Sequence, residues 1–261
     1  MQSLAIMSPL SALKIVGSGP AGPNYALAPR VLAPDPKEAF MFPASQDEYY
    51  IDIDLGVAMP VDSVYVGYHN SVATNQMIAL QTLGNFADLP INATVIEPTS
   101  LIPLGLGLPY HSFMRAEGPS VGRYWRFIIR NRGDNPPLTV GVLALGLTWQ
   151  AQFGHEWGAG RTIEDTGSSE RLFGGGFAID DGVAAGGYQW TFGDLQPDEV
   201  RRLYQIVKDR RTTRSLLVVE DPDQTDGLNE RIHWGLLRKL DAYERLDPLN
   251  TKWSLQIGDW A

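Results

Sequence analysis

The sequence predicts a mainly β protein, with an N-terminal β-sandwich followed by a smaller C-terminal β-sandwich that carries one α-helix. Apolar and polar residues alternate with a period of two in several short segments of residues 1–150, where a helical period is missing. The 27 glycines and 18 prolines are spread along the chain, as they are in strands joined by turns. One segment near residue 200 instead has the period of an amphipathic helix.

Composition limits the classes of function. The 261 residues suffice for one large domain or two ordinary ones, and we expect two. The net charge of −9 and the pI near 4.9 oppose the phosphate backbone, so we expect no nucleic-acid partner. The chain has no cysteine, which excludes disulfides, thiolate nucleophiles and Cys-based zinc sites. Neither a signal peptide nor an apolar run long enough to span a membrane is expected.

The first domain is expected over residues 1–150. Residues 50–56 place Ile51, Ile53 and Leu55 on one face of a strand and the two aspartates between them on the other. The same alternation predicts strands at residues 61–68, 123–130 and 139–149. A strand with one apolar face must bury that face against another sheet, so the expected packing is a sandwich.

Residues 151–170 are polar and Gly-rich, and they are expected to form a linker or an exposed loop before a second domain at residues 171–261. In that domain the helix is expected at residues 197–211, where a proline suits the first turn and two acidic residues suit the positive end of the helix dipole. Candidate strands lie at residues 171–179, 187–192, 214–220, 233–246 and 252–260.

Three motifs resemble ligand sites, and their surroundings disfavour each. The string from Gly17 to Gly22 matches a dinucleotide-binding fingerprint, but the prolines that follow interrupt the helix that such a site needs. The acidic residues 221–226 resemble a calcium loop with wrong spacing, so an acidic turn is expected, and metal binding there stays open. Asn92 begins a glycosylation sequon, which needs a secretory route. We expect no cofactor.

The sequence offers no catalytic constellation, so we expect a protein that is not an enzyme. Asp52 and Asp54 share one strand face, without a visible carboxylate across a groove from them. Four residues lie in loops after or between the predicted strands and could line a small-molecule or sugar site at one end of the sandwich: His69, Asn70, Tyr110 and His111. The alternative is that these loop side chains are only solvated.

A second candidate surface lies in the C-terminal domain. Arg201, Arg202 and Lys208 belong to a basic cluster on the predicted helix, which is either a solvated face or a patch that docks on an acidic neighbour. Trp253 and Trp260 in the closing strand suit burial at a subunit contact, and core packing explains them equally well.

Three segments of the N-terminal domain resemble the discoidin-like (coagulation factor 5/8 type C) jelly-roll. They are Tyr-Ile-Asp-Ile-Asp-Leu-Gly at 50–56, the strand at 60–67, and Gly-Arg-Tyr-Trp-Arg-Phe-Ile-Ile at 122–129. The resemblance covers roughly residues 25–150. The chain lacks the cysteine pair common in secreted members of that family.

The C-terminal part is similar to the ends of minor tail and tail-tip proteins of long-tailed phages over about residues 170–261. The residues that carry this similarity are the strands and helix at 187–211, Val-Val-Glu-Asp-Pro at 218–222, His-Trp-Gly-Leu at 233–236 and Trp-Ser-Leu-Gln-Ile at 253–257. Those proteins use a small sandwich with one flanking helix, like the tail-tube fold, to build rings.

The two resemblances together imply a structural subunit of a phage tail tip or baseplate. Such a protein is made in the cytoplasm of a bacterial host, resides in the virion, and forms a homo-oligomeric ring against tail-tube and hub proteins and neighbouring tip subunits. The alternative hypothesis is an adhesin whose jelly-roll loops bind host-surface polysaccharide.

Overall fold

The computed structural model describes residues 3–18, 25–42, 48–85, 88–101, 110–133, 135–248 and 250–260. It is mainly β, with a single α-helix in that part of the chain, and this confirms the predicted fold class. The chain divides into two compact units. We call Ala5–Trp149 with Leu217–Ile232 the sandwich unit, and Met1–Leu4, Gln150–Leu216 and His233–Ala261 the helix unit.

The sandwich unit is built from β-strands and three 3-10 helices. The strands are β1 Leu4–Pro9, β2 Lys14–Ser18, β3 Phe40–Phe42, β4 Glu48–His69, β5 Gln76–Asn85, β6 Asp88–Ser100, β7 Tyr110–Asn131, β8 Leu138–Val140, β9 Val142–Gln150 and β14 Leu216–Glu220. The 3-10 helices are η1 Tyr25–Leu32, η2 Pro36–Glu38 and η3 Leu228–Arg231. The strand order is β14-β1-β9-β4-β7-β5-β6, β2 adds to β4, and β3 pairs with β8.

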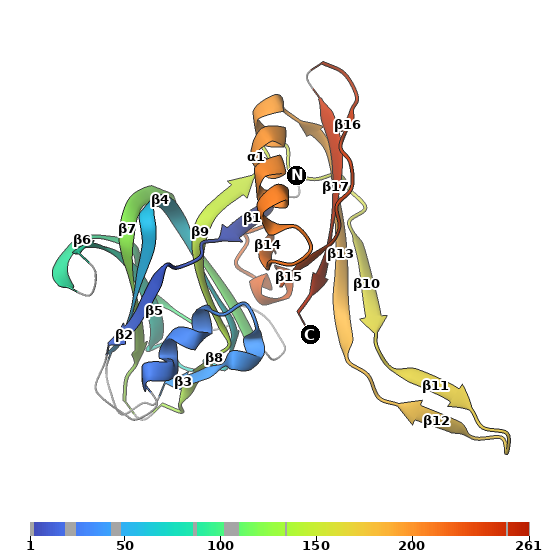
Figure 1. The fold of residues 1–261 in the computed structure, drawn as a ribbon, viewed down its shortest axis with the longest axis horizontal. Coiled ribbons are helices and arrows are strands. Elements are labelled where there is room, and N and C mark those ends of the chain that lie inside the picture. Colours follow the sequence, from blue (N-terminus) through green and yellow to red (C-terminus); the bar gives the residue numbers. More distant parts are fainter. Residues whose placement is uncertain are drawn as a thin grey trace. The chain divides into compact units, whose positions relative to one another are not determined.

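Two long strands connect the layers of the sandwich unit. β4 and β7 pair along their whole length, with shifts of register between Asp54 and Met59 and again between Val61 and Ser63. The first half of β4 lies beside β2, and its second half lies beside β9. The sheet therefore curves around its own core, as the strands β4, β5, β7 and β9 do in Figure 1.

The core of the sandwich unit contains the apolar faces that the alternation predicts. Ile51 and Ile53 are buried in it, as are Trp125 and Phe127 of the partner strand β7. From β9 and the second half of β4, Leu143, Leu145, Val64 and Val66 complete it. Burial of these side chains stabilises the fold by roughly 1.5–3 kcal/mol each relative to exposure.

The helix unit consists of one sheet, one helix and a separate hairpin. Its elements are β10 Gly160–Asp165, β11 Ser168–Arg171, β12 Phe177–Asp180, β13 Ala184–Leu195, α1 Pro197–Arg210, β15 Ile232–Lys239, β16 Glu244–Arg245 and β17 Thr251–Asp259. The sheet order is β10-β13-β17-β15, with β16 on β17, and β11 pairs only with β12. Glu199 caps α1 by accepting a hydrogen bond from the backbone N of Gln196, and Leu203 and Val207 are buried.

The structure differs from the expected domain plan at two places. Residues 217–232 belong to the sandwich unit, where β14 lies next to β1, although they follow the helix in sequence. Part of the expected linker at 151–170 forms strands β10 and β11. Gly19 to Gly22 of the Gly-rich string and the side chain of Asn92 lie outside the described residues. Within the described part of the chain, no helix has the length and apolar character to cross a membrane.

Candidate functional site

Aromatic side chains gather where β4 ends beside the start of β7. We call Tyr65, Tyr68, His69, Tyr110 and His111 the strand-end cluster. The β4–β7 register shifts between Gly67 and His69, so Tyr68 forms a bulge. Its φ of 56° is in the left-handed region, which costs a residue with a Cβ about 1–2 kcal/mol. Such strain persists where the surrounding packing holds it, and it is concentrated at functional sites.

His111 connects one side of this cluster. Its ring meets that of Tyr68 edge to face, with centroids 4.8 Å apart, and its Nδ1 lies 2.9 Å from the Tyr65 hydroxyl. The backbone N of His111 donates to Oδ1 of Asn229 over 2.6 Å. A residue of η3 thus fixes the start of strand β7 and with it the ring beside Tyr68.

His69 lies inside the unit, with only 1% of its surface exposed. Its Nε2 is 2.9 Å from the Ser112 hydroxyl, and its Nδ1 accepts a hydrogen bond from the backbone N of Ser71. Burial, and secondly the charge of His111, lowers the pKa of His69 to about 3. The ring is therefore neutral near pH 7, and because Nδ1 accepts, we assign the proton to Nε2.

Of the four residues expected in loops, only Asn70 lies outside a strand: His69 ends β4, and Tyr110 and His111 begin β7. The structure also separates the four. The half-buried ring of Tyr110 lies 6.0 Å from that of His69, whereas His111 contacts Tyr68 and Tyr65. Asn70 is exposed, but its side chain donates to the Pro137 carbonyl and accepts from the backbone N of Thr139.

His69 and Asn70 therefore support the end of the sandwich, while Tyr68, Tyr110 and His111 keep partly exposed rings. Sequence reasoning missed Tyr68 and Tyr65. The aromatic composition of residues 65–69 was the available signal, because the backbone conformation of Tyr68 depends on the bulge.

The carboxylates of β4 are used in ion pairs with β7. Asp52 binds Arg126 through both oxygens, and Asp54 binds Arg123 in the same way. The hydrogen bond from Arg123, together with that from the backbone of Gly56, lowers the pKa of Asp54 despite partial desolvation. A carboxylate held ionised by an arginine is a poor general acid.

A guanidinium organises the acidic loop that follows β14. Arg231 donates to the carbonyls of Glu220 and Asp226, at 3.1 and 2.8 Å, and to that of Gln224. Among the described residues, no group of three or more His, Asp or Glu side chains could hold a metal ion. These backbone carbonyls thus face the guanidinium of Arg231.

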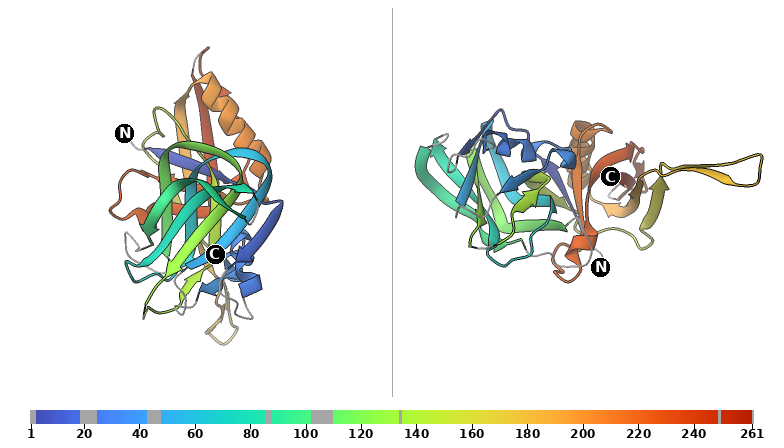
Figure 2. Two further views of the ribbon diagram at one scale, coloured as in Figure 1. Left: turned by 90° about the vertical axis from the view of Figure 1, so that its left-hand side faces the viewer. Right: turned by 90° about the horizontal axis from the view of Figure 1, so that it is seen from below.

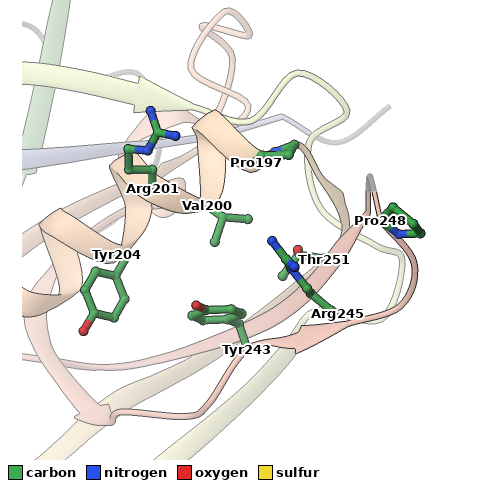
Figure 3. A pocket seen from close by; sticks show the side chains of 8 residues that line it. All are labelled: Pro197, Val200, Arg201, Tyr204, Tyr243, Arg245, Pro248 and Thr251. Atoms are coloured by element: carbon green, nitrogen blue, oxygen red, sulfur yellow. The ribbon is translucent and has the colours of Figure 1, made fainter.

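Some of the proposed interface residues line two adjoining cavities beside α1. Arg201 lines a cavity of about 560 Å³, together with Tyr204 and Tyr243 (Figure 3). Lys208 and Trp253 line an adjoining cavity of about 670 Å³ that includes the same two tyrosines. Arg202 is exposed and lines neither cavity, and Trp260 lines a third one, of about 400 Å³, next to Leu236 and Arg238.

No protein-family model matches the chain, and no curated protein sequence matches it either. Solved structures do match over about half of the chain. Chitosan-binding module 1 of a chitosanase/glucanase from Paenibacillus sp. IK-5 is 12% identical, with a TM-score of 0.37, covering 53% of this chain and 97% of that one.

Two further matches are modules of family 32. The module of AlyQ, in complex with 4,5-unsaturated mannuronic acid, is 15% identical, with a TM-score of 0.38 and coverages of 52% and 96%. The module of Clostridium perfringens NanJ, in complex with galactose, is 13% identical, with a TM-score of 0.36 and coverages of 54% and 98%. These three structures are carbohydrate-binding modules.

Proposed function

We propose that this chain is a carbohydrate-binding protein and that the strand-end cluster of the sandwich unit contacts the sugar. The observation that carries this proposal is Tyr68, whose left-handed backbone is strained and whose ring stays partly exposed. A residue with an unstrained backbone could also pack against His111, so packing alone does not explain the strain at Tyr68. A functional requirement for the Tyr68 ring at this position explains the energetic cost of its backbone conformation.

The chemistry of the cluster suits a saccharide. Partly exposed tyrosine rings offer an apolar face to sugar C–H groups and a hydroxyl to sugar hydroxyls. Because His69 is neutral near pH 7, it adds no charge behind that surface. The resemblance of the strand motifs at 50–56 and 122–129 to the discoidin-like family agrees with binding at a loop end. We propose binding without turnover, since the β4 carboxylates are paired with arginines.

Glycan-array screening followed by calorimetry tests the proposal. Replacing Tyr68 or Tyr110 with alanine is expected to weaken binding of the best array ligand at least tenfold. Tyr124→Ala is the matched control, because Tyr124 is also half-buried on β7 but lies beside Arg123 rather than in the cluster. Flat isotherms for the unmodified protein with envelope polysaccharides would contradict the proposal, as would equal losses in all three variants.

A second candidate function is structural assembly, as in the tail-tip hypothesis. It is favoured by the hairpin of β11 and β12 with the turns at its two ends, residues 166–183, which we call the arm. All of its residues are exposed except Gly167, and five of them are large and apolar: Leu172, Phe173, Phe177, Ile179 and Val183. Exposed apolar side chains on a strand hairpin mark an interaction surface or an aggregation liability.

Light scattering after size-exclusion chromatography, together with mass spectrometry of isolated virus particles, tests the structural proposal. An oligomer in solution and the presence of the chain in particles are expected. A strict monomer that is absent from particles would contradict it.

A further inference from the structure

We infer that the arm of one copy binds a groove beside α1 of a second copy. This inference rests on the proposed role in assembly and names the two surfaces that meet. The α1 groove consists of the two adjoining cavities that share Tyr204 and Tyr243, with Trp253 in its wall and Arg201, Lys208 and Arg245 around it.

The arm has an apolar tip and two different faces. Leu172 begins its turn, and the next residue, Phe173, is fully exposed. Three glycines follow Phe173, and they have no side chains that could cover its ring. Paired residues of an antiparallel hairpin share a face, so Phe177 and Ile179 lie together and Glu170 lies on the opposite face with Asp180. Figure 2 shows the arm as a slender hairpin extending from the β10–β13 end of its unit.

The groove has an aromatic surface that complements the apolar tip of the arm. The rings of Tyr204, Tyr243 and Trp253 are 5.3 to 6.5 Å apart, and the first two are nearly half exposed. They form an aromatic surface that can receive a side chain such as Phe173. Its volume is ample, since pockets for whole drug-sized ligands measure about 300–1,000 Å³.

The charges agree with the apolar match. Arg201, Lys208 and Arg245 take part in no ion pair with the described residues, and the one carboxylate lining the groove, Asp241, pairs with Lys239. The arm has three acidic residues, Glu170, Asp180 and Asp181, against one basic residue. A partner of this composition covers the rings and neutralises unpaired cations in one contact.

The arm cannot reach the groove of its own chain. β13 leaves the arm at Ala184, which pairs with Asp165, and it arrives eleven residues later at Leu195, which pairs with the groove residue Thr251. At about 3.3 Å per residue these ends are roughly 36 Å apart. The arm continues away from the sheet at the first end (Figure 1), so the groove it meets belongs to another copy.

Each copy offers one arm and one groove. Two copies can exchange arms reciprocally in a two-fold dimer, or the contact can run head-to-tail until a ring closes or a filament grows. In both arrangements, copies with a defective arm and copies with a defective groove should complement each other. A dimer formed by two arms or by two grooves would not show this complementation.

The test mixes two variants of the full chain. Phe173→Asp disables the arm, and the double variant Arg201→Glu, Lys208→Glu disables the groove; all three positions are exposed, so the fold should be kept. Each variant alone is expected to be monomeric by light scattering, with association at least tenfold weaker than for the unmodified chain. Their equimolar mixture is expected to give a dimer. Val57→Asp, at an exposed apolar residue of the sandwich unit, is the control and should assemble normally.

A crosslink identifies the contact directly. Because the chain has no cysteine, Gly174→Cys in one copy and Ala242→Cys in another provide the only thiols, and both leave the rings of Phe173 and Tyr243 in place. Oxidation of the mixed single variants is expected to give a covalent dimer, whereas Val57→Cys mixed with Ala242→Cys should not.

The outcomes separate this inference from the proposals on which it rests. A monomeric unmodified chain overturns both assembly and the arm–groove contact. An oligomer lost with Phe173→Asp but kept in the groove variant supports assembly and overturns the groove as the binding surface. Glycan binding through Tyr68 is read independently, since neither variant alters the strand-end cluster.

Discussion

Arg126 and Asp52 form a two-fold hydrogen-bonded ion pair inside the sandwich unit, with Nε–Oδ1 and Nη2–Oδ2 distances of 2.6 and 2.7 Å. Asp52 has no exposed surface, and Arg126 is 8% exposed with the ring of Tyr50 over its guanidinium. The pair joins the strands β4 and β7 on the side opposite the apolar core.

Breaking this pair is expected to be costly. Asp52→Asn leaves the Arg126 charge buried without its counter-ion, so we expect the free energy of unfolding in urea to fall by about 3–5 kcal/mol. Arg123→Met is the comparison, because the Arg123 side chain is 43% exposed and Asp54 keeps the hydrogen bond from the backbone of Gly56, so the loss should be smaller. The double variant Asp52→Leu, Arg126→Met should recover most of the stability; no recovery would argue against a cost from the unpaired charge.

The buried His69 makes stability depend on pH in a defined window. Its pKa of about 3 in the folded protein is far below the value near 6.5 of an exposed histidine, so below pH 6.5 the unfolded chain binds the extra proton. Stability from the neutral ring is complete above pH 6.5 and falls by up to about 1.4 kcal/mol per pH unit toward pH 3. Thermal unfolding of the wild type and of His69→Gln from pH 7 to pH 4.5 measures it: the slope should be smaller in the variant. Equal slopes would contradict the assignment.

Gly141 is expected to tolerate no side chain. A Cβ at this position would lie 2.8 Å from the Pro36 carbonyl oxygen and 2.8 Å from the Cβ of Tyr68. Gly141→Ala should therefore lower the free energy of unfolding by about 1–3 kcal/mol through overpacking. It should also displace Tyr68 and weaken glycan binding, whereas Gly118→Ala, which meets open space, should change neither.

The acidic loop is expected to be independent of calcium. Because Arg231 already binds three of its carbonyls, neither calcium nor a chelator should shift the melting temperature. Arg231→Ala should loosen the loop and cost about 0.5–1.5 kcal/mol, because two of the three hydrogen bonds are exposed and water can replace the guanidinium there. Limited proteolysis within residues 221–227 measures the loosening, and protection by calcium in the unmodified protein would contradict the prediction.

Local patterns predicted the elements that bury one face. The alternation at residues 50–56 corresponds to part of β4, and the helical spacing at 197–211 corresponds to α1. In both elements the apolar residues recur with the period at which side chains return to the face that is buried in the core. The single strand expected at residues 171–179 was wrong: the structure places the turn of the arm within it, between β11 and β12. With both faces exposed and a run of glycines, the arm has no periodicity that marks its two strands.

Two further features depend on distant parts of the chain. That β14 lies beside β1 depends on strand pairing across some 200 residues, which no local signal encodes. Whether His69 is buried or solvated likewise depends on Ser112 and Ser71 around it. The sequence could therefore nominate the end of the sandwich as a site, but not divide its residues into supporting and exposed ones.

The late position of β14 and η3 has a consequence for synthesis. A ribosome that has released Trp149 must add the next 83 residues before the sandwich unit can be completed at Ile232, which takes roughly 4–17 s at about 5–20 residues per second. During that interval the nascent β1 edge lacks its neighbour and can pair with a foreign strand. Slow translation should therefore raise the aggregated fraction, and a circular permutant that begins at residue 217 should lower it.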